Sequence, residues 1–141
     1  MDDPKVQKVL KKYEKSYDNN IALFLSAKNG LAPQAAFDLI DVTSLTAKMI
    51  ESILFVTIKT LTNYKQKKTN LNASISEKVL SIFALYKKGI SIFDSIDDFN
   101  RWMATPAYGL GEQKPNELLG TITGINLIME ELTRIEYGDL A

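Results

Sequence analysis

Apolar residues recur at intervals of three and four positions over most of the chain, which is the spacing of an amphipathic α-helix. Residues 5–17 show this clearly, because Val6, Val9, Leu10 and Tyr13 fall on one face and lysines surround them. The same periodicity predicts further helices over residues 34–41, 44–51, 57–66, 74–93, 95–105, 115–119 and 123–137. These segments cover most of the chain, so the pattern predicts an all-α fold.

Residues that favour helix ends separate these segments. Ser44 is a candidate N-cap, and Ser74 forms a capping box with Glu77. Ser95 precedes a first turn with acidic side chains, which the helix dipole favours. The short apolar stretch 21–25 is compatible with either a strand or a helix, and both alternatives stay open.

Three short helices follow closely on one another between residues 34 and 66, and an apolar turn at 53–56 precedes the last of them. This arrangement is compatible with a helix-turn-helix, whose last helix enters the major groove of DNA. Lysines gather at the end of that helix. Such lysines neutralise phosphates in DNA-binding proteins, although a lysine run is also typical of a solvated surface. The candidate DNA-binding residues are Thr57, Lys59, Thr60, Asn63, Tyr64, Lys65, Lys67 and Lys68.

The composition excludes several classes of function. The chain has 141 residues, with 17 basic and 17 acidic side chains and neither His nor Cys. It therefore offers no disulfide, no Cys or His metal site and no Ser-His-Asp triad. The sequence also lacks a nucleophile–base constellation and a calcium-loop spacing. We expect no catalytic residues, no bound metal, no cofactor and no enzymatic activity.

The charges are unevenly distributed along the chain. Residues 1–90 carry fourteen lysines against eight acidic residues, whereas residues 91–141 carry three basic against nine acidic residues. An excess of six positive charges is thus followed by an excess of six negative charges. This asymmetry indicates two surfaces with different partners, or a local fluctuation in composition.

The sequence does not predict a membrane protein. No run approaches the roughly 20 apolar residues that cross a bilayer. The acidic start lacks the apolar region of a secretory signal. We therefore expect a cytoplasmic protein that makes no membrane contact.

A spaced set of residues in the second half carries a family resemblance. Trp102 is followed by Pro106, a Leu-Gly pair stands at 110–111, a Pro-x-x-Leu-Leu segment at 115–119 and a Tyr-Gly pair at 137–138. This signature resembles the toxin-binding domain of the Xre/MbcA/ParS-like antitoxins of bacterial type II toxin–antitoxin systems.

The resemblance covers about residues 30–138 and implies a division into three parts. Residues 1–29 are expected to be a variable N-terminal helical extension, 30–72 an Xre-like helix-turn-helix region, and 73–141 the antitoxin toxin-binding and dimerisation domain. The implied fold is an N-terminal helix-turn-helix-like bundle joined to a small C-terminal helical toxin-binding domain.

The function implied by the resemblance is that of a non-enzymatic antitoxin. It would bind and neutralise a cognate toxin, often a RES-domain enzyme that consumes NAD, and bind operator DNA to repress its own operon. Members often carry an arginine pair after the recognition helix, where this chain has lysines. Lysine neutralises phosphate but lacks the planar fork that reads guanine. The alternative function is a stand-alone helix-turn-helix transcriptional regulator without a toxin.

The resemblance places the toxin contact at the C-terminal end of the chain. Candidate toxin-binding residues there are Glu130, Arg134, Tyr137 and Gly138. For Arg134 the alternative is a pair with Glu130 one turn earlier in the same helix. Gly138 is expected to adopt the left-handed conformation that ends a helix and turns the final residues away.

A homodimer is the expected assembly. Helices 76–93 and 123–137 carry more apolar residues than a domain of this size buries alone, so we expect the dimer to form through the second half. A helix-turn-helix usually reads paired half-sites through a two-fold axis, which favours the same assembly.

Overall fold

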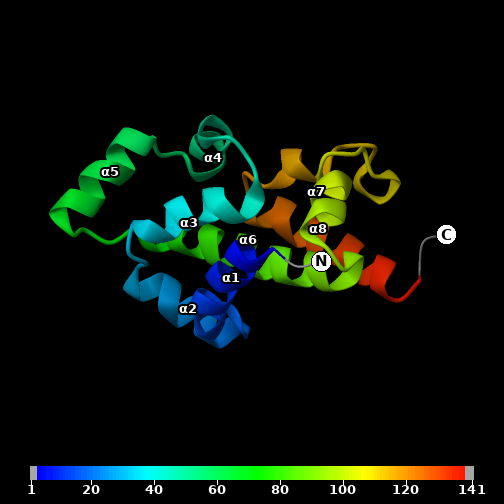
Figure 1. The fold of residues 1–141 in the computed structure, drawn as a ribbon, viewed down its shortest axis with the longest axis horizontal. Coiled ribbons are helices and arrows are strands. Elements are labelled where there is room, and N and C mark those ends of the chain that lie inside the picture. The colour runs from blue at the N-terminus through cyan, green and yellow to red at the C-terminus, as the bar shows by residue number, and fades with distance from the viewer. Residues whose placement is uncertain (1–2, 139–141) are drawn as a thin grey trace.

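The computed structural model describes residues 3–138 and is drawn in Figure 1. Its α-helices are α1 (Pro4–Tyr17), α2 (Asn20–Asn29), α3 (Gln34–Thr43), α4 (Ala47–Leu54), α5 (Ile58–Lys67), α6 (Ala73–Phe93), α7 (Ile96–Met103) and α8 (Ile122–Glu136). Two 3-10 helices, η1 (Tyr108–Leu110) and η2 (Pro115–Leu118), lie between α7 and α8. Within residues 3–138 no strand forms, and a bridge joins Ala107 to Gln113. The predicted all-α class is confirmed.

The long helix α6 forms the centre of the molecule. It runs along the length of the ribbon in Figure 1 and contacts α1, α2, α3, α4, α7 and α8. Its Tyr86 ring is fully buried and meets the Phe99 ring of α7 edge to face, with ring centroids 4.9 Å apart. Gly89 permits this close approach, because a Cβ there would lie 2.2 Å from the Phe99 ring. One core therefore serves the whole described chain.

The N-terminal helices belong to this same core. The Tyr13 ring of α1 stacks on Phe83 of α6 with centroids 4.8 Å apart. The apolar stretch 21–25, which the pattern left open, is helical and lies within α2. The two expected N-terminal regions thus pack against α6 of the third. The boundaries of the three regions stay a prediction.

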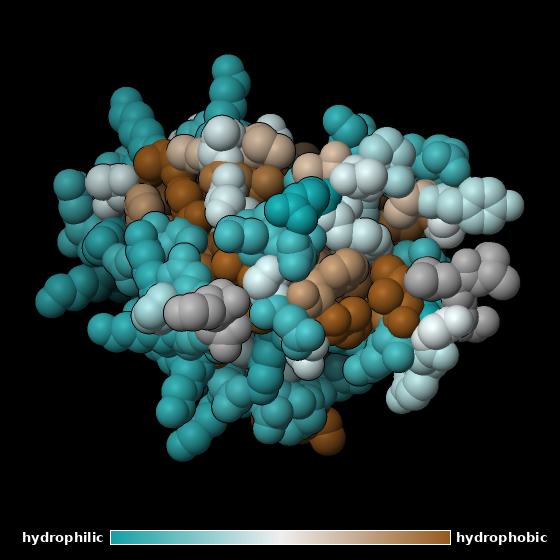
Figure 2. Space-filling model, turned by 45° about the vertical axis from the view of Figure 1, so that its right-hand side comes forward, coloured by the Kyte–Doolittle hydropathy of each residue, from teal (hydrophilic) through white to brown (hydrophobic). Residues whose placement is uncertain are grey.

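The apolar residues of α6 are used within one chain. Val79, Leu80, Ile82 and Phe83 are fully buried, and α8 likewise buries most of its apolar face. The expectation that these helices have apolar surface to spare is therefore wrong, with Leu127 of α8, 43% exposed, as an exception. The face drawn in Figure 2 is accordingly mostly hydrophilic, with apolar atoms exposed in patches.

The start of α6 differs from the predicted capping box. Asn72, rather than Ser74, is the N-cap, and its side chain accepts a hydrogen bond from the Ile75 amide at 2.8 Å. Leu71 decides this position, because its side chain is buried and its amide donates to the Leu31 carbonyl at 2.8 Å. The chain is thus fixed directly before Asn72, and the helix begins there.

Of the other two predicted N-caps, the one for α4 is wrong and the one for α7 is confirmed. Ser44 is not an N-cap; it ends α3 in a left-handed conformation with φ 60°. Thr46 caps α4 instead, accepting a hydrogen bond from the Met49 amide at 3.1 Å. Ser95 caps α7 as predicted, accepting from the Asp98 amide at 3.0 Å.

Candidate functional site

The helix α5 lies at one end of the molecule, away from the centre of α6 (Figure 1). Leu61 is its fully buried residue and anchors it to the core. The chain turns between α4 and α5 at Phe55, which adopts a left-handed conformation with φ 57°. Ile58 and Tyr64 pack partly against the same core, and the exposed residues of α5 are Lys59, Asn63, Lys65, Gln66 and Lys67.

The eight residues predicted to meet DNA lie on α5 and its two ends. Thr57, Lys59, Asn63, Lys65, Lys67 and Lys68 are exposed, while Thr60 and Tyr64 are half-buried. Thr57 is the N-cap of α5, and its hydroxyl donates to the Thr60 hydroxyl at 3.0 Å and accepts from the Thr60 amide at 3.1 Å. The hydroxyls of Thr57 and Thr60 are therefore engaged in hydrogen bonds that cap the N-terminus of α5. Asn63, by contrast, is exposed and makes no such contact within the described residues.

The lysines of α5 differ in how they are held. The Lys65 ammonium donates to the Gln34 side chain of α3 at 2.6 Å and lies 5.2 Å from the centroid of the Phe37 ring. Lys59 and Lys67 have no ion-pair partner among residues 3–138 and face solvent. Lys65 thus braces α5 against α3, while the other lysines leave their charge available.

At the other end of the chain, Arg134 is held within α8. Its guanidinium pairs with Glu131, with Nη2 at 2.7 Å and Nε at 2.9 Å from Oε1. The intrahelical partner is therefore Glu131 and not Glu130, which is exposed. Two of the five N–H donors of the guanidinium are used in this pair, so others remain for a partner.

The end of α8 is open to solvent. Tyr137 is 79% exposed. Gly138 adopts the expected left-handed conformation with φ 72°, and its amide donates to the Ile135 carbonyl at 3.0 Å. The expected path of the final residues away from the bundle lies outside the described residues.

Sequence reasoning missed the loop that packs beside Arg134. Glu131 is buried, and its carboxylate lies directly against Gly109 of η1. Tyr108, next to it, is 85% exposed. The burial of Glu131 had a signal in the sequence, because this residue follows Ile128 by three positions on the buried side of α8.

Sequence reasoning also missed Lys78, which joins the end of α4 to the segment before α8. This residue of α6 is buried, and its ammonium donates to the Ile53 carbonyl at 2.8 Å and to the Gly120 carbonyl at 2.7 Å. The Phe55 ring centroid lies 4.6 Å from the same nitrogen. Burial lowers the pKa of Lys78. The end of α4 and the start of α8 are thus tied through one cation.

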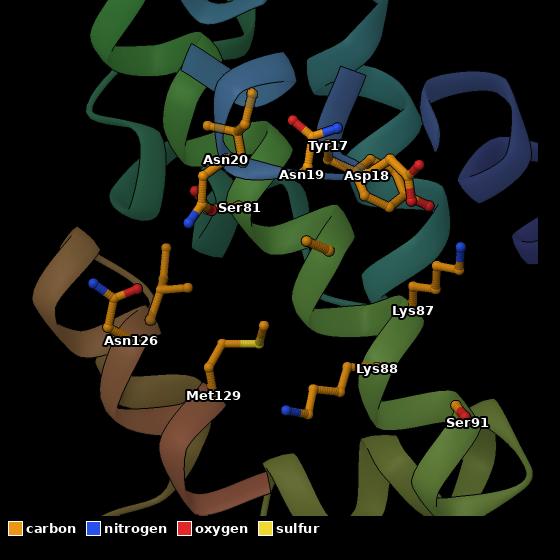
Figure 3. Close-up of a pocket in the computed structure, with 13 residues that line it drawn as sticks. Tyr17, Asp18, Asn19, Asn20, Ser81, Lys87, Lys88, Ser91, Asn126 and Met129 are labelled. Carbon is orange, nitrogen blue, oxygen red and sulfur yellow. The ribbon is translucent and has the colours of Figure 1, made fainter. Parts of the chain in front are cut away.

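A groove of about 480 Å³ crosses α6 between the α1–α2 turn and α8, as Figure 3 shows. Two lysines of α6 line it: Lys87 pairs with Glu14 of α1, and Lys88 donates to the Thr133 hydroxyl of α8. Asp18 is the carboxylate in the lining. The groove therefore has no pair of carboxylates for acid–base chemistry.

The described part of the chain, residues 3–138, brings no three acidic side chains together in a way that could hold a metal ion. Nor does it contain a helix both long and apolar enough to cross a membrane.

Comparison with known protein families identifies the C-terminal part of the chain. Residues 88–138 match the family model of the antitoxin Xre/MbcA/ParS C-terminal toxin-binding domain. The match runs from the last turn and a half of α6 through α7, η1, η2 and α8. The resemblance found in the sequence is confirmed for this segment. A search of curated proteins found no match.

Proposed function

We propose, from the premise that residues 88–138 form a toxin-binding domain of the Xre/MbcA/ParS antitoxin family, that this protein neutralises a cognate toxin by binding it with the end of α8. Tyr137 carries the proposal. It stands at the end of the matched segment, directly after the last residue of α8, and is 79% exposed. An exposed aromatic side chain is a frequent anchor of a protein interface.

The proposed toxin contact consists of Glu130, Arg134, Tyr137 and Gly138. The pair with Glu131 restricts the Arg134 side chain, so little side-chain entropy is lost when it meets a carboxylate of the toxin. A segment that docks at the active-site cleft of an enzyme inhibits it by occlusion. The antitoxin then needs no catalysis of its own. We further propose that the toxin is a RES-like enzyme and that neutralisation takes place in the cytoplasm.

The second part of the proposal is operator binding by α5. Helices α3 to α5 would serve as the helix-turn-helix, with Thr57, Lys59, Thr60, Asn63, Tyr64, Lys65, Lys67 and Lys68 at or near the DNA. The exposed lysines support contact with phosphates, since their charge is available to neutralise the backbone. A homodimer would place two α5 helices on paired half-sites and repress the operon of the antitoxin and its toxin.

The toxin contact is tested by co-expression with the toxin encoded beside this protein. A chain that ends at Glu136 keeps all of α8 and its Arg134–Glu131 pair, and Tyr137→Ala removes one side chain. Both variants should lose neutralisation and co-purification with the toxin. Tyr108→Ala is the matched control, because this tyrosine lies in the same family segment and is 85% exposed.

Two outcomes would contradict the proposed toxin contact or the antitoxin function. If the shortened chain neutralises fully and Tyr108→Ala does not, the toxin binds the η1 loop and the proposed site is wrong. If the protein neutralises no neighbouring toxin but binds operator DNA, the stand-alone regulator is the correct function.

A further inference from the structure

The helix α2 leaves an apolar face uncovered. Ile21, Phe24 and Leu25 are 72%, 63% and 50% exposed, whereas Ala27 on the other side is buried. A helix that is apolar all round is normally covered on all sides. In Figure 1, α2 forms the lower edge of the molecule, and an apolar group protrudes from that edge in Figure 2. We call this exposed surface of Ile21, Phe24 and Leu25 the α2 face.

A hollow lies next to the α2 face. It has a volume of about 440 Å³ and is lined by Phe24, Ala27 and Lys28 from α2 and by Ala73, Ser74 and Glu77 from the start of α6. Much of its lining is therefore made of small side chains beside an exposed aromatic ring. A large apolar side chain from a partner fits such a place, because ridges on one helix pack into grooves beside another.

The charges around the α2 face are complementary to those of a second copy. Asp18 stands just before α2 and Lys28 near its end, and both are exposed. When two copies of α2 cross antiparallel about a two-fold axis near residue 23, the start of α2 in each copy, with Asp18 just before it, meets the end of α2 in the other copy, which carries Lys28. The same register sets Ile21 opposite Leu25. One symmetric arrangement thus satisfies both the charges and the apolar side chains.

We propose that this protein dimerises through the α2 face, with α2 antiparallel to α2 of a second copy. This rests on the homodimer of the proposed function and names its surface. The large apolar residues of α6 are buried or partly buried, and α2 lies outside residues 88–138. The dimer therefore leaves the toxin-binding domain of each copy free.

The mass of the full chain in solution, measured by light scattering at micromolar concentration, tests the proposal. The unchanged protein should have twice the mass of one chain. Phe24→Glu should raise the dimer dissociation constant roughly 100-fold or more, because it places a carboxylate at the centre of an apolar interface. Leu127→Glu is the matched control: it adds the same charge at an exposed apolar residue of α8 and should leave the dimer intact. Circular dichroism establishes that both variants fold.

Charge exchange tests the antiparallel register. Asp18→Lys alone and Lys28→Asp alone bring like charges together, and each should weaken the dimer roughly fivefold. The double variant restores opposite charges across the axis and should recover the original dissociation constant. If the single variants dissociate and the double variant does not recover, the register is wrong.

The remaining outcomes separate the possible failures. A single-chain mass for the unchanged protein would refute the homodimer itself and leave the antitoxin function untouched. A dimer that survives Phe24→Glu but not Leu127→Glu forms through α8. If Phe24→Glu leaves the dimer intact and abolishes toxin binding, the α2 face belongs to the toxin, and the inference is overturned.

Discussion

Gly109 and Glu131 lie in such close contact that a Cβ on residue 109 would come within 2.2 Å of the Glu131 carboxylate oxygen Oε1. The same oxygen accepts the hydrogen bond from Arg134 Nε at 2.9 Å. The η1 loop therefore closes over the ion pair that positions one of the proposed toxin-binding side chains. Only a residue without a side chain permits this arrangement.

Gly109→Ala should disturb that arrangement. The added methyl group must displace the Glu131 carboxylate, which is the end of a flexible side chain, so the expected loss of unfolding free energy lies at or below the lower end of the about 1–3 kcal/mol typical of overpacking. Toxin affinity should fall as well, because Arg134 loses its fixed orientation. Gly120→Ala is the control, since no atom lies within 4 Å of a Cβ at residue 120. Urea unfolding and toxin titration measure both effects; equal values for the two variants would refute the role of this contact.

Replacing Lys65, Lys67 and Lys68 together by Ala should weaken binding to the upstream operon DNA. Each lysine near a phosphate releases counterions, so the slope of log K against log salt should become shallower by roughly 2–3. The matched control replaces Lys8, Lys11 and Lys15, three exposed lysines of α1, which removes the same charge elsewhere. If both triple variants change affinity and slope equally, α5 is not the specific DNA contact.

Lys78→Met should destabilise the whole molecule. The buried ammonium holds the carbonyls of Ile53 and Gly120, and its loss leaves both without a hydrogen-bond donor. The expected loss is about 2–4 kcal/mol of unfolding free energy, measured in urea. Lys87→Met on the same helix removes an exposed ion pair with Glu14 and should cost less than about 1 kcal/mol. Similar losses for the two variants would contradict the proposed tie between α4 and α8.

Stability should fall in alkaline solution because of buried tyrosines. Burial, aided by the nearby charges of Glu14 and Asp18, raises the pKa of Tyr17 to about 12. In the unfolded chain the pKa of tyrosine is about 10, so the unfolded state releases its proton first. The stabilising contribution of Tyr17 is thus complete below pH about 10 and is lost as pH rises through the native pKa.

Tyr17→Phe should make this alkaline decline shallower. Burial also raises the pKa of Tyr13, with Asp38 adding to the effect, and the pKa of Tyr86. These two tyrosines should account for the alkaline decline that remains in the variant. The variant also loses the hydrogen bond from the Tyr17 hydroxyl to the Leu10 carbonyl, which lowers stability at every pH. Unfolding in urea at a series of pH values separates the two effects. An unchanged pH slope would show that Tyr17 ionises equally in both states; Tyr108→Phe is the exposed control.

Local features of the sequence were sufficient for the all-α class and for the family of residues 88–138, but they left the stretch 21–25 in α2 open. The periodicity of the apolar residues predicted the all-α class, and Ser95 capped α7 as expected, because helix formation depends on residues within one or two turns. The spaced signature from Trp102 to Gly138 identified the matched domain in the same way. The prediction of α5 and its exposed lysines needed no knowledge of distant residues.

Contacts between distant parts of the chain decided the rest. Lys78 has the sequence surroundings of a surface lysine, and it is buried only because the carbonyls of residues 53 and 120 converge on it. Asn72 rather than Ser74 begins α6 because Leu71 is fixed by Leu31, forty residues earlier. Tertiary packing also explains why the exposed apolar surface lies on α2 and not on α6, where the sequence led us to expect it. Periodicity shows that a helix has an apolar face, and only tertiary packing decides which face is covered by the same chain.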